Sequence, residues 1–326
     1  MSRPGFRTFV TSAAAPSGGD GWPPAVFDPA GPYSEPVTIL AWVLVLGGAL
    51  VFTIVIAALW VALRGSPRLK ARLGGEKAIW TLGFAFAAVV LTGLLIWGLT
   101  LTSSLSATRV TGGEMRVKII GEMWWWRVHY QDAEGRETLR DANELHIPIG
   151  KPVLLELEAA DVIHSFWVPR LGGKMDMIPG RTNWLLIQAD APGIYKGQCA
   201  EYCGGPHALM GFVVVAHTPD DFARWQASRQ PRGGGGGVGL RLFLSSGCAA
   251  CHTIRGTPAN GLAGPDLTHV GSRQTLGAGI LSNNPGTMAG WIADAQAIKP
   301  ANRMPAYHQF SGEELRALSD YMVSLK

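Results

Sequence analysis

The chain has 326 residues, enough for two or three ordinary domains. Its composition is apolar, with 47% hydrophobic and 16% charged residues, and much of the apolar excess lies in two uncharged runs near the N-terminus. A formal net charge of +4 without a basic tract argues against a nucleic-acid partner. The first 20 residues lack the apolar core of a signal peptide, so no cleaved signal is predicted.

The two uncharged stretches, 37–63 and 78–101, predict a hairpin of membrane-spanning helices behind an outer segment, 1–36. At about 1.5 Å per residue, each can cross a hydrocarbon core of about 30 Å. Two buried core helices are the alternative, and the length and the lack of a polar face argue against it. The connecting loop is basic, so the positive-inside rule predicts that it is cytoplasmic and that both chain ends lie outside.

After the hairpin, expected to end at residue 102, the pattern changes to short β-rich segments separated by glycine and proline. Strands are predicted at 116–119, 153–158, 183–188 and 212–216. This spacing predicts a Greek-key β-sandwich or barrel over residues 103–228. Three consecutive tryptophans begin at Trp124, and one is expected to be exposed and two buried, because aromatic runs in strands usually belong half to the core.

The first pair of cysteines belongs to a soft donor set. Cys199 and Cys203 are followed by His207 and Met210, and His164 offers a second imidazole upstream. Thiolate, imidazole and thioether favour copper over hard cations. One blue-copper ion uses a single thiolate, whereas two bridging thiolates can hold two copper ions. A disulfide or a zinc half-site is the alternative, and zinc leaves Met210 unexplained.

The second pair lies in a further domain. A short helix is predicted to begin at Thr218, and a tether over 229–237, with five consecutive glycines, precedes a domain at 238–326. There Cys248-Ala-Ala-Cys251-His252 has the Cys-x-x-Cys-His pattern of covalent c-type haem, with His252 as an iron ligand. Met304 is expected on the other side of the iron. Three further residues compete for that position: Met288, His269 and His308.

Residues of about 35–217 resemble cytochrome c oxidase subunit II, and 238–326 resemble a small all-α class I cytochrome c. The first resemblance rests on Gly121-Glu-Met-Trp124-Trp-Trp126, on Asp161-Val-Ile-His164-Ser-Phe-Trp167-Val-Pro169, on Gly173-Lys174-Met-Asp176, on Pro179-Gly-Arg181 and on Gly197-Gln-Cys199-Ala-Glu201-Tyr-Cys203-Gly.

The resemblance implies a cupredoxin-like domain with a two-copper CuA centre. Its implied ligands are His164, Cys199, the backbone carbonyl of Glu201, Cys203, His207 and Met210. The Glu201 carboxylate would face Mg²⁺ or Mn²⁺ at the interface with subunit I, and Trp124 would be the residue at which electrons enter. The family often has a glutamate three residues before the tryptophan of the second span. Lys77 holds that place here, which leaves Glu76 a weak candidate for proton uptake.

The implied activity is that of a proton-translocating cytochrome c oxidase in the bacterial cytoplasmic membrane, with the copper and haem domains on the outer, periplasmic face. The site of oxygen reduction would lie in subunit I. An external cytochrome or a quinol-oxidising complex would supply electrons, and membrane lipid would surround the hairpin. Two alternatives stay open: the small subunit of a copper-containing nitric oxide reductase, and a membrane-tethered carrier without a catalytic partner.

Overall fold

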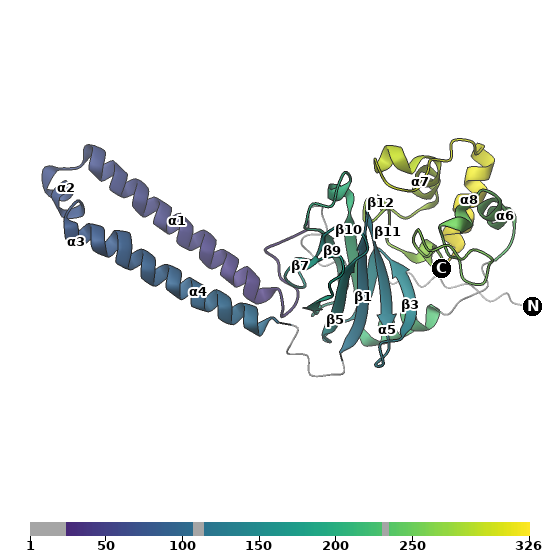
Figure 1. Cartoon of the computed structure of the whole chain (residues 1–326), viewed down its shortest axis with the longest axis horizontal. Coiled ribbons are helices and arrows are strands. Elements are labelled where there is room, and N and C mark those ends of the chain that lie inside the picture. Colours follow the sequence, from purple (N-terminus) through teal and green to yellow (C-terminus); the bar gives the residue numbers. More distant parts are fainter. Residues whose placement is uncertain (1–23, 107–113, 230–234) are drawn as a thin grey trace, which may run out of the picture.

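The computed structural model describes residues 24–106, 114–229 and 235–326. Its membrane-type hairpin begins with α1 (Glu35–Arg64) and returns through α3 (Glu76–Ala78), the π-helical η1 (Ile79–Ala85) and α4 (Phe86–Ser104). The short α2 (Pro67–Leu73) lies in the turn, where the Ser66 hydroxyl caps its first turn. Figure 1 shows the two long helices side by side and antiparallel.

Both long helices are apolar enough to cross a membrane, and the most apolar window of each has no residue buried by the described chain. Lipid or another subunit must therefore cover these side chains. The two expected long apolar helices are present, each one to three residues longer at either end than the uncharged stretches.

The middle of the chain is a β-sandwich of two five-stranded sheets, ordered β3-β2-β1-β5-β8 and β4-β10-β9-β6-β7. The sandwich core is rich in large side chains, among them the edge-to-face rings of Trp126, Phe166 and Phe212. Alternation in β1 places Val117 and Ile119 in that core. The strands are β1 (Met115–Glu122), β2 (Trp125–Gln131), β3 (Glu137–Ala142), β4 (Glu144–Pro148), β5 (Val153–Ala159), β6 (His164–Trp167), β7 (Met175–Met177), β8 (Asn183–Ile187), β9 (Gly193–Cys199) and β10 (Gly211–His217).

The segment before the hairpin is bound to the sandwich. Ala30 N–H donates to the Arg170 carbonyl at 2.7 Å, and the Ser34 hydroxyl donates to the same oxygen at 2.6 Å. Asp28 pairs with the Arg170 guanidinium at 2.8 Å. A Cβ on Gly31 would lie 1.9 Å from the Gln188 carbonyl oxygen, so the backbones touch here. The segment that leads into α1 is thus held against the β domain through Arg170 and Gln188.

Helix α5 (Pro219–Ser228) follows the sandwich and begins at Thr218, as predicted, with its hydroxyl accepting from Asp221 N–H. Arg229, which was expected to open the tether, is buried instead. Its guanidinium donates to the Ser272 hydroxyl at 2.7 Å and lies over the Trp225 ring. The tether residues 230–234 lie outside the described part of the chain, as do residues 1–23 of the outer segment.

The C-terminal domain is helical and has its own core, including Phe243, Ile292, Leu318 and Met322. Helices α6 and α8 pack closely because Gly239 faces Tyr321, where any Cβ would lie 2.3 Å from that residue's Cβ. A capping box of Ser311 and Glu314 begins α8. The elements are α6 (Val238–Ser245), η4 (Cys248–Ala250), η5 (Val270–Ser272), β11 (Thr275–Leu276), β12 (Leu281–Ser282), α7 (Pro285–Ile298) and α8 (Gly312–Ser324).

Candidate copper centre and haem cavity

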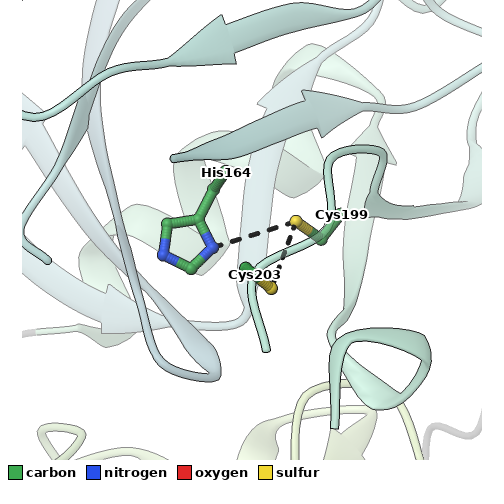
Figure 2. Close-up of side chains that lie close together, drawn as sticks. All are labelled: His164, Cys199 and Cys203. Atoms are coloured by element: carbon green, nitrogen blue, oxygen red, sulfur yellow. Dashed lines mark hydrogen bonds between the residues drawn. The ribbon is translucent and has the colours of Figure 1, made fainter. Parts of the chain in front are cut away.

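The residues predicted to bind copper converge at one end of the β-sandwich. The Sγ atoms of Cys199 and Cys203 lie 3.8 Å apart, far beyond the roughly 2.0 Å of a disulfide. His164 Nδ1 lies 3.8 Å from the first sulfur, and His207 Nδ1 lies 3.5 Å from the second. Figure 2 shows His164, Cys199 and Cys203 directed toward one another.

Two further donors complete this group, which we call the copper cradle. Met210 Sδ lies 3.8 Å from Cys203 Sγ, and the Glu201 carbonyl oxygen lies 3.2 Å from Cys199 Sγ. The cradle is built from the start of β6, the end of β9, the loop after it, the 3-10 turn η3 (His207–Leu209) and the residue before β10. Two thiols, two imidazoles, a thioether and a carbonyl match the soft donor set that copper prefers.

His164 is held in place by neighbours that the sequence reasoning did not single out. Its Nε2 bonds to Asp161 Oδ1 at 3.0 Å, and that carboxylate also accepts the Met123 N–H at 2.8 Å. The bond to Asp161 leaves Nδ1 directed at Cys199. A Cβ on Gly121 would lie 2.9 Å from the His164 ring, so only glycine allows this approach. Asp161 and Gly121 both lie within the sequence motifs quoted above. Those motifs are the sequence signal by which the two residues could have been identified.

The electrostatics of the Cys199 and Cys203 thiols favour binding of a cation. The hydrogen bond with Cys203 is the main cause that lowers the pKa of Cys199 to about 4, against the effect of burial. That same bond, burial and the neighbouring thiolate raise the pKa of Cys203. One thiol therefore ionises readily and the second resists, because two negative charges 3.8 Å apart repel. Bound cations remove this obstacle, so the residues fit a metal that ionises both.

The second site is a cavity of about 410 Å³ between the C-terminal domain and the β domain, since residues of both line it, Trp124 and Asn143 among those of the β domain. The haem-attachment residues Cys248, Cys251 and His252 line it. His252 Nδ1 donates to the Pro265 carbonyl at 2.8 Å, which fixes the tautomer and leaves Nε2 free to bind iron. A Cβ on Gly264 would lie 2.6 Å from the His252 ring. Volume, thiols and imidazole all fit a covalently bound haem.

The candidates for the second axial position are now placed. Met304 and Met288 both line the cavity, the former in a half-buried loop and the latter on α7 with its side chain packed into the domain core. The Met304 loop is held by Gln296, whose amide donates to the Met304 carbonyl at 2.6 Å. His269 and His308 do not line this cavity; the first is buried against Arg229 and the second lies on the surface.

Known proteins share this combination of domains. Residues 115–217 match the family described as cytochrome C oxidase subunit II, periplasmic domain, and residues 238–326 match cytochrome c. Cytochrome c oxidase subunit 2 of Alkalihalophilus pseudofirmus is 34% identical over 314 residues, covering 92% of this chain and 90% of that protein. The chain belongs to the cytochrome c oxidase subunit II family. It is a membrane-anchored member with a fused cytochrome c domain, and such a subunit is where electrons enter a terminal oxidase.

Other relatives match part of the chain. Cytochrome c oxidase subunit 2 of Bacillus subtilis is 30% identical over 225 residues, which are 64% of this chain and 62% of that one. Among solved structures, the periplasmic domain of subunit II of the Bradyrhizobium japonicum oxidase is 31% identical. It covers 37% of this chain and 96% of its own, with a TM-score of 0.34. Family membership and the fold class predicted from the sequence, with its cupredoxin-like and cytochrome c domains, are both confirmed.

Trp124 lies between the two sites. Its indole N–H donates to the Cys203 carbonyl at 2.8 Å, and the same residue lines the haem cavity. Gly204, at φ +112°, permits this contact, because a Cβ there would lie 3.0 Å from the indole. The expected burial of the tryptophan run was wrong. Only Trp126 is fully buried, while Trp124 and Trp125 are half-buried, because the cytochrome domain and Arg127 cover them.

The outer side of the cradle is open to a partner. The Glu201 side chain is half-buried, and its neighbour Tyr202 exposes 73% of its surface. Val162 and Ile163, just before His164, are also exposed. Lys174 and Asp176 form an exposed pair at 3.1 Å. An exposed apolar group beside a buried donor set is typical of a surface that another subunit covers.

Proposed function

We propose that this chain accepts electrons at a haem c, passes them to a two-copper CuA centre and delivers them to subunit I, which reduces O₂ to water with proton translocation. Cys248 and Cys251 would hold the haem covalently, with His252 and Met304 as axial ligands. The cradle, His164, Cys199, the Glu201 carbonyl, Cys203, His207 and Met210, would hold the copper pair. Bound there, haem iron and copper each supply a one-electron carrier.

One observation carries the proposal: Trp124 contacts both sites. Its side chain lines the haem cavity, and its indole N–H bonds directly to the backbone of the cradle residue Cys203. The protein supplies orientation around it. Pro265 fixes the His252 ring, Asp161 fixes the His164 ring, and mainly apolar side chains line the cavity between the domains.

The setting of this electron path is part of the proposal. We place the chain in the bacterial cytoplasmic membrane, with the copper domain at 103–228 and the cytochrome domain at 238–326 on the periplasmic side of the hairpin. The Glu201 carboxylate beside exposed Tyr202 suits Mg²⁺ or Mn²⁺ at the contact with subunit I, since carboxylate oxygens are the ligands of hard cations.

The test uses the complex recovered from its own membranes in detergent through a tag on this chain. Reduced cytochrome c should support rapid oxygen uptake that cyanide abolishes. Trp124→Phe removes the indole N–H bonded to Cys203 and should slow uptake several-fold with haem and copper contents unchanged. The matched control is Trp184→Phe, on β8, a partly exposed residue that does not line the haem cavity.

Absence of oxygen uptake from a complex with haem, copper and the catalytic partner all present would contradict the proposal. Reduction of nitric oxide by that complex would point to the reductase alternative. A chain that recovers no partner would point to a tethered carrier.

A further inference from the structure

The cytochrome domain is seated on the β domain through a buried ion pair. Arg273, in the loop after η5, donates from Nε to Asp141 Oδ1 on β3 at 2.8 Å. Their side chains expose only 6% and 4% of their surface. Breaking such a buried pair by removing one partner is strongly destabilising, because the other charge stays buried without compensation. If the domains separated, both groups would have to be hydrated again.

Lys299 makes a second connection at the wall of the haem cavity. Its ammonium donates to the Trp124 carbonyl at 2.7 Å and to the Gly277 carbonyl at 2.9 Å, and the residue is 3% exposed. Among residues 24–106, 114–229 and 235–326, no carboxylate lies within ion-pair distance of it. Burial lowers the pKa of Lys299 to about 7. One side chain therefore ties the cytochrome domain to the backbone of the residue that contacts the cradle.

Backbone groups complete the contact. Gly211 N–H, at the start of β10, donates to the Ala278 carbonyl at 2.8 Å. Gln274 N–H donates to Glu144 Oε2 at 2.7 Å. A Cβ on Gly279, where φ is +88°, would lie 3.4 Å from the Gly211 Cα. Hydrogen bonds require a defined distance and angle, so these two bonds hold the cytochrome domain in one arrangement on the β domain.

We propose that the cytochrome domain stays seated on the copper domain throughout turnover, with Lys299 as the residue that positions the haem cavity against Trp124. Trp124 then receives electrons only from this chain's own haem, and a soluble donor must deliver them to that haem. The claim that a haem donates electrons to Trp124 rests on the proposed function. The claim that the cytochrome domain stays bound to the copper domain rests only on the contacts described above.

An engineered disulfide tests the seating. A Cβ on Gly205 would lie 3.6 Å from the Ala301 Cβ across the interface, within the usual Cβ separation of about 3.5–4.5 Å in disulfides. The double variant Gly205→Cys/Ala301→Cys, purified as the whole complex, should form this bond spontaneously, as measured by mass spectrometry of the linked peptides. Oxygen uptake with reduced cytochrome c should be equal before and after mild reduction of the bond.

Either of two results would overturn the inference: failure of the bond to form in a complex with full haem and copper content, or uptake that stops in the oxidised variant and returns on reduction. The second result would mean that the domain must move to collect each electron. Failure of the proposed function would be distinguishable, since the parent complex without the engineered cysteines would then consume no oxygen. Formation of the disulfide would still show whether the two domains are in contact.

Lys299→Met tests the positioning role, with the exposed Arg316→Met as the matched control. The electron-transfer rate from photoreduced haem to copper should fall several-fold in the first variant and stay unchanged in the second, with unaltered spectra of both centres. The slowed rate should also become sensitive to ionic strength, because a loosened interface exposes its charges to screening. Parental rates and salt dependence in Lys299→Met would remove Lys299 from this role.

Discussion

The copper cradle and the haem cavity differ in how closely the residues of each site pack on one another. In the cradle, the donor atoms lie 3.2–3.8 Å from neighbouring thiol sulfurs, and the strands that carry them belong to a sandwich with its own core. The haem cavity is a space of about 410 Å³ lined by residues of both the cytochrome domain and the β domain. Copper ions would therefore add little to the packing of the β domain, whereas a haem would contact much of the cytochrome core.

Seven buried apolar side chains of the cytochrome core line the haem cavity: Phe243, Val270, Leu276, Met288, Ile292, Leu318 and Met322. A bound haem would cover these side chains, and burial of apolar surface is the main favourable term in folding. The cytochrome domain should therefore depend on haem for folding, whereas the copper domain should fold without copper. Four variants can break or sharpen this contrast.

The largest effect is expected from losing haem. Cys248→Ser/Cys251→Ser removes both thioether attachments, and the cytochrome domain should lose its cooperative unfolding transition because the apolar core side chains that line the cavity would no longer be covered by haem. Calorimetry and protease digestion of the purified chain measure this. The copper domain should still melt as a unit in the same sample. A cytochrome domain that stays folded without haem would contradict the comparison.

A smaller effect on folding is expected from losing copper. His164→Asn should abolish copper binding, as measured by metal analysis, and lower the stability of the β domain by only about 1–3 kcal/mol through the lost hydrogen bond to the Asp161 carboxylate, which keeps its bond from the Met123 N–H. His129→Asn is the control, since that ring pairs with Glu137 on the outside of the sheet. Unfolding of the β domain in the first variant would show that this domain depends on copper for folding.

The smallest effect is expected from two single methyl groups, because both cofactors should stay bound and only the orientation of one ligand ring at each site should change. Gly121→Ala and Gly264→Ala place a Cβ 2.9 Å and 2.6 Å from the rings of His164 and His252, respectively. Overpacking of this kind costs about 1–3 kcal/mol, and each ring should tilt. The first variant should change only the copper spectrum and the second only the haem spectrum. Gly173→Ala, where a Cβ meets open space, is the control.

Chemistry carried by short spacings was predictable from the sequence. The four cysteines, with the histidines and methionines near them, indicated both sites, because ligand spacing depends on local backbone geometry. Paired contacts between distant segments were not predictable. Nothing around Lys299 marks it as buried, and the carbonyl it binds belongs to Trp124, 175 residues away. Asp141 and Arg273, 132 residues apart, carry no local signal either. The prediction of burial for the tryptophan run was wrong for the same reason, since residues of the cytochrome domain, distant in sequence, lie against it.

The hydrogen bond from the Ser34 hydroxyl to the Arg170 carbonyl has a consequence for biosynthesis. Ser34 precedes the membrane hairpin, yet its partner carbonyl lies 136 residues later in the chain. At about 5–20 residues per second, the ribosome makes that partner on the order of 10 s after Ser34. The hairpin is therefore synthesised before the surface that receives the first described residues exists. The β domain must bind a segment that was synthesised earlier. The contact between Ser34 and Arg170 is therefore a late step in the maturation of the chain.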